Sequence, residues 1–243
     1  MRATWLSFVL TVVSQVAAAE VAPEYASEDE RYKADILVIV AHPDDETQDV
    51  ASYLARAVFD EHRRVAVIFT TRAEAGPSVI GNESGRALGA EREIEARRAL
   101  AHFGIYNVFF IGGRHTSGTQ NVLTALENMD HGAVLGEAVR LIRLTRPEVI
   151  ITWLPMPVAG ENHADHQAAS IIANEAFDLA GDPSVLSEQL YTLDPHERVA
   201  HDPEGLQPWQ PKKIFYYTDA FDAACTCWTE RPLPSPYRKN FLD

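Results

Sequence analysis

Runs of apolar, largely β-branched residues alternate along this chain with segments in which apolar residues recur every three to four positions. The run 35–40 is apolar almost throughout, which is typical of a strand that is covered on both faces of a parallel sheet. The same alternation predicts further strands over 65–70, 108–111, 149–153 and 214–218, and helices over 46–61, 85–103, 134–144 and 164–179. We therefore expect an α/β fold: a Rossmann-like three-layer sandwich with a mainly parallel central sheet, in a single domain.

The first residues predict a separate, removable segment. Met1-Arg2, the mostly apolar run 4–16 and Ala17-Ala18-Ala19 have the charged, apolar and small-residue layout of a signal peptide. The apolar run is shorter than the roughly 20 residues of a membrane span, and an uncleaved N-terminal anchor is the alternative. We expect residues 1–19 to be a signal peptide, the protein to be secreted or periplasmic, and no stable membrane span to remain after cleavage.

Residues 20–243 are expected to form one domain, with a core at about 35–180 and a C-terminal extension over 181–243. The formal net charge of −14 argues against nucleic acid or an anionic membrane surface as a partner, because both require clustered Lys and Arg. This charge is compatible with a neutral or cationic ligand and with a bound divalent cation. The only two cysteines, Cys225 and Cys227, are interpreted as small side chains of a C-terminal segment, without a functional role.

Unusual polar side chains follow two of the expected strands. His42-Pro43-Asp44-Asp45-Glu46 comes after the first strand, and Glu161-Asn162-His163-Ala164-Asp165-His166 comes after the fourth. In open α/β sheets, ligands bind in the crevice at the carboxyl ends of the strands. If these two strands are close in the sheet, both segments contribute imidazoles and carboxylates to one cleft.

The chemistry of these side chains suits a metal site. Catalytic zinc takes three nitrogen or oxygen ligands from the protein and keeps one position open for water. His42 and Asp45 are spaced so that a turn can direct both to one point, and His166 can complete the set. A metal there would lower the pKa of its water toward about 7. Asp44, beside a ligand, can then accept the proton of that water as a general base.

Two further residues are expected to assist. His163 can stabilise a developing oxyanion or protonate a leaving amine, and Asp165 can orient and charge that imidazole. Each motif alone has a simpler explanation: an acidic first helical turn is favoured by the helix dipole, and His-x-x-His spacings arise by chance. Helix capping explains neither His42 nor His163, so we favour the joint site.

These motifs resemble the LmbE-like, or PIG-L, family of N-acetylglucosaminyl-phosphatidylinositol de-N-acetylases. The family signature Ala-His-Pro-Asp-Asp-Glu stands unbroken at 41–46. A second signature, His-Pro-Asp-His, is matched at 163–166 with Ala164 in place of proline. The resemblance covers roughly 36–179. It implies the same roles as the residue chemistry: His42, Asp45 and His166 as zinc ligands, Asp44 as the base and His163 as the oxyanion-stabilising group.

Two less specific matches concern the substrate. Residues 71–76 resemble a Thr-x-Gly-Glu-x-Gly turn of the family, and Arg92 with Glu95 resembles its Arg-x-x-Glu pair. The resemblance implies that Arg92 contacts substrate and that Glu74 borders the pocket. Without it, Arg-x-x-Glu on a helix is a surface salt bridge of little energetic consequence. The chain departs from the family at Ala73, Pro77 and 114–118, which alters the expected pocket wall.

The function implied is that of an exported zinc-dependent hydrolase of linear amides, with Fe²⁺ as an alternative metal in the cell. It would remove the N-acetyl group from an N-acetylglucosamine-containing sugar or glycoconjugate. A hydrolase of a different amide at the same site, and a non-catalytic sugar- or metal-binding module, remain as alternatives. Phosphoester hydrolysis by a metal pair is not favoured, because that chemistry needs more carboxylate ligands and a phosphate-binding loop.

Overall fold

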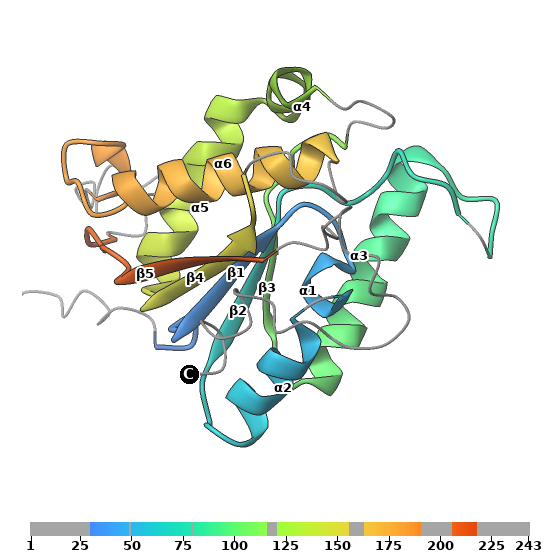
Figure 1. Ribbon diagram of the computed structural model, residues 1–243. Helices are drawn as coiled ribbons and strands as arrows, with labels where there is room; N and C mark the ends of the chain where they lie inside the picture. The colour runs from blue at the N-terminus through green and yellow to red at the C-terminus, as the bar shows by residue number, and fades with distance from the viewer. Residues whose placement is uncertain are drawn as a thin grey trace, which may run out of the picture.

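The computed structural model describes residues 30–48, 50–78, 80–115, 121–155, 163–190 and 206–217. Within these residues one sheet has the strand order β3-β2-β1-β4-β5 (Figure 1). Its strands are β1 (Ile36–Val40), β2 (Val65–Phe69), β3 (Asn107–Phe110), β4 (Val149–Trp153) and β5 (Lys213–Tyr217). All four neighbouring pairs are parallel, so the predicted α/β class is confirmed and the sheet is parallel throughout the described part of the chain.

Several predictions for the chain ends cannot be compared with this fold. The expected signal peptide (1–19) and the two cysteines, Cys225 and Cys227, lie outside the described residues. Of the expected C-terminal extension, 181–190 contains one short 3₁₀ helix, η1 (Ser187–Gln189), and 206–217 includes β5. Among the helices of the described ranges, none combines the length and the apolar content that crossing a membrane requires.

Helices cover both faces of the sheet, as the three-layer prediction requires (Figure 1). One face is covered by α2 (Ala51–Phe59) and α3 (Gly85–His102). The other is covered by α4 (Val122–Met129), α5 (His131–Thr145) and α6 (Ala164–Leu179). A four-residue helix, α1 (Asp45–Gln48), lies directly after β1.

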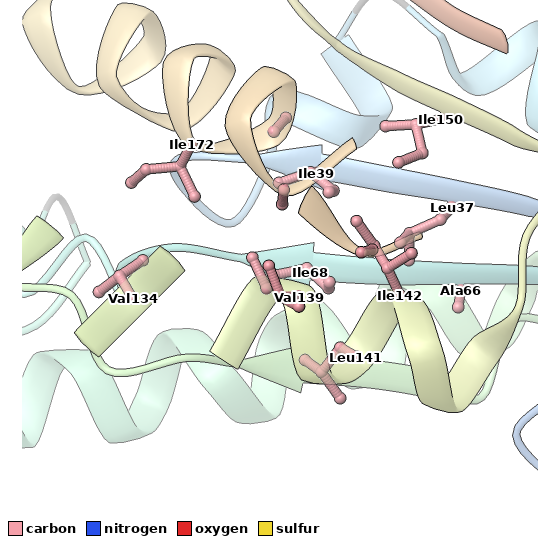
Figure 2. Packing of buried hydrophobic residues seen from close by; sticks show 14 of the residues in the cluster. Leu37, Ile39, Ala66, Ile68, Val134, Val139, Leu141, Ile142, Ile150 and Ile172 are labelled. Atoms are coloured by element: carbon pink, nitrogen blue, oxygen red, sulfur yellow. The ribbon is translucent and has the colours of Figure 1, made fainter. Parts of the chain in front are cut away.

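The central strand shows why its sequence is apolar at every position. Successive side chains of a strand point to opposite faces of the sheet. Leu37 and Ile39 pack against the α5 and α6 side (Figure 2), whereas Val38 and Val40 pack against the α2 and α3 side. All four are fully buried, and each such side chain contributes about 1.5–3 kcal/mol through burial of apolar surface. The strand is therefore fixed from both faces.

Two helix predictions differ from the structure. The helix expected over 46–61 is divided into α1 and α2, with Val50 in a non-helical conformation at the start of α2. The helix expected over 134–144 begins earlier, at His131, and follows α4, which the sequence pattern did not predict. Asp130 has a left-handed backbone (φ 59°) and separates α4 from α5. Apolar periodicity continues across this residue, so periodicity alone does not reveal the break.

A buried arginine holds the segment that follows α6. Arg143 of α5 is 1% exposed, and its guanidinium donates five hydrogen bonds. The acceptors are the backbone oxygens of Ala180 (3.1 Å), Asp182 (3.0 Å), Val185 (2.8 Å) and Leu186 (3.1 Å), and Oε1 of Gln189 (3.0 Å). Because a guanidinium has five N–H groups, every donor of Arg143 is used.

The strand order reverses direction at β1. β1 pairs with β2 on one side and with β4 on the other, where Ile39 lies opposite Thr152. In doubly wound sheets the crevice at such a reversal, outside the carboxyl ends of the strands, is where ligands bind. The two polar motifs follow β1 and β4, so they begin side by side at this edge.

Candidate metal centre

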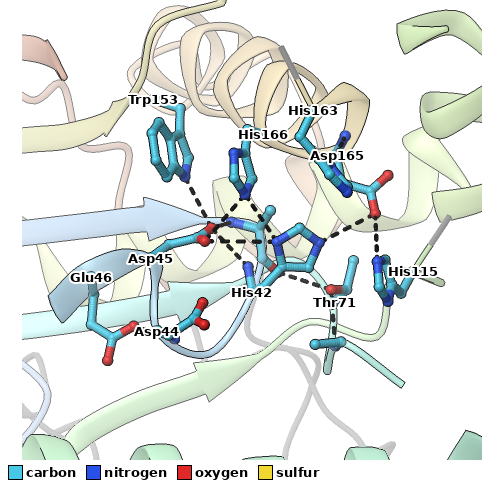
Figure 3. A network of polar contacts seen from close by, with 12 residues as sticks. His42, Asp44, Asp45, Glu46, Thr71, His115, Trp153, His163, Asp165 and His166 are labelled. Carbon is cyan, nitrogen blue, oxygen red and sulfur yellow. Dashed lines mark hydrogen bonds and ion pairs between the residues drawn. The ribbon is translucent and has the colours of Figure 1, made fainter. Parts of the chain in front are cut away.

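The Asp45 carboxylate is held through one of its two oxygens. Oδ2 accepts hydrogen bonds from the backbone N–H groups of Ala41 (3.0 Å) and His42 (2.9 Å), and from Nε1 of Trp153 (2.9 Å). Oδ1 lies 3.2 Å from Nε2 of His166 and 3.7 Å from Nδ1 of His42 (Figure 3). Three donors on one oxygen therefore orient the other toward the two imidazoles.

Neighbouring groups fix the two imidazoles as well. The ring of His166 is stacked on Trp153, with centroids 4.2 Å apart and an interplanar angle of 4°. His42 presents Nδ1 to Nε2 of His166 at 3.1 Å, and its own Nε2 lies 3.3 Å from Oδ2 of Asp165. A carboxylate behind an imidazole is a common partner of metal-binding histidines, because it fixes the orientation and tautomer of the ring.

The three predicted ligands fit a small divalent cation. Their ligand atoms are separated by 3.1, 3.2 and 3.7 Å. Tetrahedral coordination with metal–ligand bonds of about 2.0–2.1 Å separates neighbouring ligand atoms by about 3.3–3.4 Å. Two imidazoles and one carboxylate suit zinc, and the same set occurs with ferrous iron. The residues present are therefore those that such a metal requires.

The electrostatic surroundings also favour positive charge at this point. Burial alone would lower the pKa of His42, but its contacts with Asp165 and Asp45 outweigh burial and raise this pKa to about 10. Burial opposes ionisation of Asp45, yet contacts with His166 and His42 hold the pKa of its carboxyl well below the usual range. The carboxylates thus carry the negative charge that a cation between these side chains would neutralise.

Asp44 lies beside the three ligands with an exposed side chain and a strained backbone. Its φ of 121° is rare for any residue other than glycine, and such outliers gather at functional sites. Its N–H donates to Oε2 of Glu46 (3.0 Å), and its carbonyl accepts from the backbone N–H of Thr47 (2.9 Å), which secures the turn. Although Asp44 is exposed to solvent, the protein around it removes part of the water from its carboxyl, and this desolvation and then the charge of Asp45 raise the pKa of Asp44; the charges of His42 and Arg92 oppose the shift.

His163 caps the N-terminus of α6. Its Nδ1 accepts a hydrogen bond from the backbone N–H of Asp165 (3.2 Å), which places the proton of the neutral ring on Nε2. Its ring centroid lies 5.1 Å from that of His42 and 5.0 Å from that of His166. The buried carboxylate of Asp165 contacts His42 and a further histidine, His115. The predicted orienting role of Asp165 toward His163 stays a prediction.

His115 belongs to the same cluster, although the sequence analysis gave it no role. Its Nε2 lies 3.6 Å from Oδ2 of Asp165, and its ring centroid is 4.7 Å from that of His42. Its Nδ1 accepts from the N–H of Ala75 (3.1 Å), and its own N–H donates to Oε1 of Glu74 (3.0 Å). The signal that points to His115 is its place after β3, at the same edge of the sheet.

Trp153 was also assigned only to a strand by the sequence. It is the last residue of β4, and the hydroxyl of Ser170 donates to its backbone oxygen. The indole both donates to Asp45 and lies against His166, so it connects two of the three ligands. An indole at the carboxyl end of a strand, beside a metal motif, is the feature that points to this role.

The two predicted substrate contacts lie at different places. Glu74 borders a pocket of about 570 Å³ that also includes His115. Arg92, on α3, borders a separate pocket of about 50 Å³ and lies 3.9 Å from Glu95, a long and partly exposed ion pair. Such a pair contributes little to stability, so Arg92 is available for another contact.

Two solved structures are similar to this fold. The N,N′-diacetylchitobiose deacetylase of Pyrococcus horikoshii is 20% identical, with a TM-score of 0.58, over 76% of this chain and 61% of that chain. A conserved protein of Thermus thermophilus is 23% identical, with a TM-score of 0.51, over 76% of this chain and 66% of that chain. At these identities the comparison establishes the fold.

Sequence relatives extend the comparison. The 1D-myo-inositol 2-acetamido-2-deoxy-α-D-glucopyranoside deacetylase 1 of Frankia alni is 28% identical over 72% of this chain and 59% of the relative. A deacetylase of the same description from Streptomyces griseus is 30% identical over 65% of this chain and 53% of the relative. The chain thus spans less than two thirds of the length of these relatives. The family model described as PIG-L, GlcNAc-PI de-N-acetylase, matches residues 37–177, which is more than half of the chain and includes every predicted ligand. This chain therefore belongs to the PIG-L family.

Proposed function

We propose that the protein is a metal-dependent N-deacetylase that acts on an N-acetylglucosamine-containing sugar or glycoconjugate. One observation carries the proposal: a carboxylate oxygen of Asp45 and nitrogens of His42 and His166 converge at 3.1–3.7 Å beside the exposed Asp44. Membership of the PIG-L family and the names of the relatives support the choice of N-acetyl amino sugars.

In this proposal His42, Asp45 and His166 hold Zn²⁺, or Fe²⁺ in the cell. When bound, the cation supplies Lewis-acid polarisation of the amide carbonyl and acidifies water at neutral pH. Trp153 and Asp165 orient the ligand side chains, because the first holds the non-ligating oxygen of Asp45 and the second contacts the outer nitrogen of His42.

Asp44 acts as the general base. Its carboxylate accepts a proton from the attacking water while the oxygen of that water bonds to the amide carbon. The pKa of Asp44 is raised, first by desolvation and then by the charge of Asp45, which strengthens the carboxylate as a base, while His42 and Arg92 favour its ionised form. The positive φ of Asp44 lets its side chain leave the turn on the exposed side, while the next residue, Asp45, stays buried.

His163 acts on the other side of the amide. Its Nε2–H donates a hydrogen bond to the oxygen that gains negative charge. The carbon–nitrogen bond then breaks, acetate is released, and the leaving amine takes up a proton from His163 or Asp44. The hydrogen bond from the N–H of Asp165 to Nδ1 keeps the donor nitrogen of His163 directed away from the helix terminus.

We also propose that the protein is exported, on the basis of the signal-like residues 1–19. Expression of the full chain in a bacterial host tests this. The expected result is a periplasmic or secreted product whose new N-terminus lies near Glu20. A product that stays in the cytoplasm with Met1 intact contradicts the proposal.

The activity is tested with the purified protein, N-acetylglucosamine and N,N′-diacetylchitobiose. Amine and acetate release are measured after chelation and again after Zn²⁺ or Fe²⁺ is returned. The proposal requires release that chelation abolishes and metal restores. No release from either sugar in any metal state, while zinc binds, overturns the proposed substrate class.

A further inference from the structure

Glu46 is a buried carboxylate to which the proposed mechanism gives no role. It is 1% exposed and lies on the short helix α1, directly after Asp45. Figure 3 shows it beside Asp44 and away from the histidines of the metal centre. Within the described part of the chain, no lysine, arginine or histidine forms an ion pair with Glu46. Burial of a carboxylate without a cationic partner opposes folding, and such exceptions to the rules of stability occur at functional sites.

The contact of Glu46 is with the backbone of the proposed base. Its Oε2 accepts a hydrogen bond from the N–H of Asp44 at 3.0 Å. On the other side of the same residue, the carbonyl of Asp44 accepts from the N–H groups of Thr47 and Gln48, both at 2.9 Å. The two peptide units that flank Asp44 are therefore both held, the first by the side chain of Glu46 and the second by α1.

This arrangement fixes where the Asp44 side chain points. Peptide units are planar, so the two backbone dihedrals of a residue are set once the orientations of its flanking peptide units are set. The direction of the bond from Cα to Cβ follows from them. Glu46 therefore controls one of the two constraints on the direction of the Asp44 carboxylate.

The backbone of Asp44 needs such constraints. A φ of 121° in a residue other than glycine costs on the order of 1–3 kcal/mol and persists only where the surroundings enforce it. The carbonyl side of Asp44 has a third donor, the hydroxyl of Thr47 (2.9 Å), so loss of one contact there leaves two. On the N–H side, Glu46 provides the acceptor. Its removal would allow the first peptide unit to turn and the strain to relax.

We propose that Glu46 is a positioning residue, which directs the Asp44 carboxylate toward the attacking water by holding the N–H of Asp44. This rests on the proposed function, in which Asp44 is the general base. Glu46 touches neither substrate nor the reacting atoms in this role. The buried carboxylate thus acts on the reaction through the backbone of its neighbour.

Two variants of the zinc-loaded full chain test the proposal. Glu46→Leu keeps the approximate size of the side chain without an acceptor, and we expect kcat for acetate release to fall about 100-fold at unchanged KM and zinc content. Glu46→Gln keeps an acceptor oxygen, so kcat should stay within about fivefold of the unaltered protein. Near-full kcat in Glu46→Leu, an equal loss in both variants, or loss of zinc together with kcat overturns the proposal.

Thr47→Val is the matched control. It removes another side-chain contact of Asp44, but the carbonyl concerned keeps its two backbone donors. We expect kcat to stay within about threefold of the unaltered protein, because a single hydrogen bond with remaining alternatives contributes little. A loss as large as that of Glu46→Leu would mean that the turn as a whole, and not Glu46, sets the position of the base.

A double variant shows whether Glu46 acts through Asp44. Once Asp44→Asn has removed the base, adding Glu46→Leu should change the remaining kcat by less than about threefold, because residues that act as a unit are not additive. Zinc content and urea unfolding in chelator are the controls for folding. A further loss as large as that of the single variant would show that Glu46 acts on another group, and it overturns the proposal.

Crystal structures of the two Glu46 variants separate this proposal from the proposed function. We expect φ of Asp44 to leave the positive range in Glu46→Leu and to stay near 121° in Glu46→Gln. If the unaltered protein releases no acetate from any sugar, the proposed function is overturned, while this change of φ still supports the hold of Glu46 on Asp44. Acetate release by a Glu46→Leu protein with unchanged Asp44 supports the deacetylase and overturns the role of Glu46.

Discussion

The buried site around Arg143 and the metal centre differ in where their positive charge comes from. Arg143 carries its own charge into the interior, and five acceptors use its five N–H groups. At the metal centre, an oxygen of Asp45 and ring nitrogens of His42 and His166 lie 3.1–3.7 Å apart. The first site is complete once the chain folds, whereas the second has a ligand set that a cation from solution would complete.

This difference separates a structural role from a functional one. A buried charge without partners destabilises a protein by several kcal/mol, so buried polar groups that serve stability alone are fully hydrogen-bonded. Two imidazoles and a carboxylate that converge on one point beside an exposed side chain are instead the arrangement that a cation requires. Four variants test whether the two sites follow this division, from the largest expected effect to the smallest.

The variant His166→Ala removes one of the three ligands of the metal centre, so this site should no longer hold a cation. We expect bound zinc to fall from about one ion per chain to near none, with loss of acetate release, because two ligands hold zinc far more weakly than three. Metal analysis after dialysis and a turnover assay measure both. Thermal unfolding in chelator serves as the folding control. A variant that keeps its zinc would remove His166 from the ligand set.

The variant Asp44→Asn should leave the metal in place and stop the chemistry. Asn tolerates a positive φ as Asp does, so the turn at Asp44 is preserved. Loss of the proton acceptor is expected to lower kcat by about 10²–10⁴-fold at unchanged zinc content. Steady-state kinetics with parallel metal analysis gives the answer. Near-full activity would show that another group is the base.

The variant Arg143→Met should lower the stability of the buried site around Arg143 and leave the metal centre unchanged. Removing the guanidinium leaves four backbone carbonyls without their donor, and the free energy of unfolding is expected to fall by about 1–3 kcal/mol for each acceptor that stays buried. Urea unfolding in chelator measures this change. Zinc content at low temperature should match that of the unaltered protein. A parallel loss of zinc would mean that the two sites are not independent.

The variant Trp153→Phe probes the support of the ligands. Phe keeps an aromatic ring against His166 but cannot donate to Oδ2 of Asp45, and loss of such a supporting hydrogen bond weakens metal affinity by about 10–100-fold. Competition with a chelator of known affinity measures the change. Trp209→Phe is the matched control, because its Nε1 donates to the backbone oxygen of Pro147 instead. Equal losses in both variants would assign the effect to general destabilisation.

Much of the sheet and of the metal centre was predictable because the determining features are local. The apolar run at β1 identifies a doubly covered strand, and α6 begins and ends as its pattern predicted. Asp45 and His166 meet because both follow neighbouring strands at a reversal of strand order. Parallel strands bring their carboxyl ends to one edge, so motifs far apart in sequence could be assigned to one site.

The remaining features depend on contacts between distant segments. His115 reaches Asp165 only because the loop after β3 is held by Ala75 and Glu74 of the loop after β2. Asp165 contacts His42 because of the way α6 packs against β1. The motif 163–166 alone does not specify this packing. The left-handed turn at Asp130 interrupts an apolar pattern that continues across it. No sequence spacing encodes these contacts directly.

The wide sequence separation of the metal-centre contacts also has a consequence for the order of folding. Trp153 lies 108 residues, His166 124 residues and Tyr217 172 residues beyond the β1 loop residues that they contact. At a synthesis rate of about 5–20 residues per second, Asp45 leaves the ribosome about 5–35 s before these partners. Contacts of such separation form late, because their loops must close first. A cation that binds His42, Asp45 and His166 only after they have come together therefore stabilises the finished fold and none of its early intermediates.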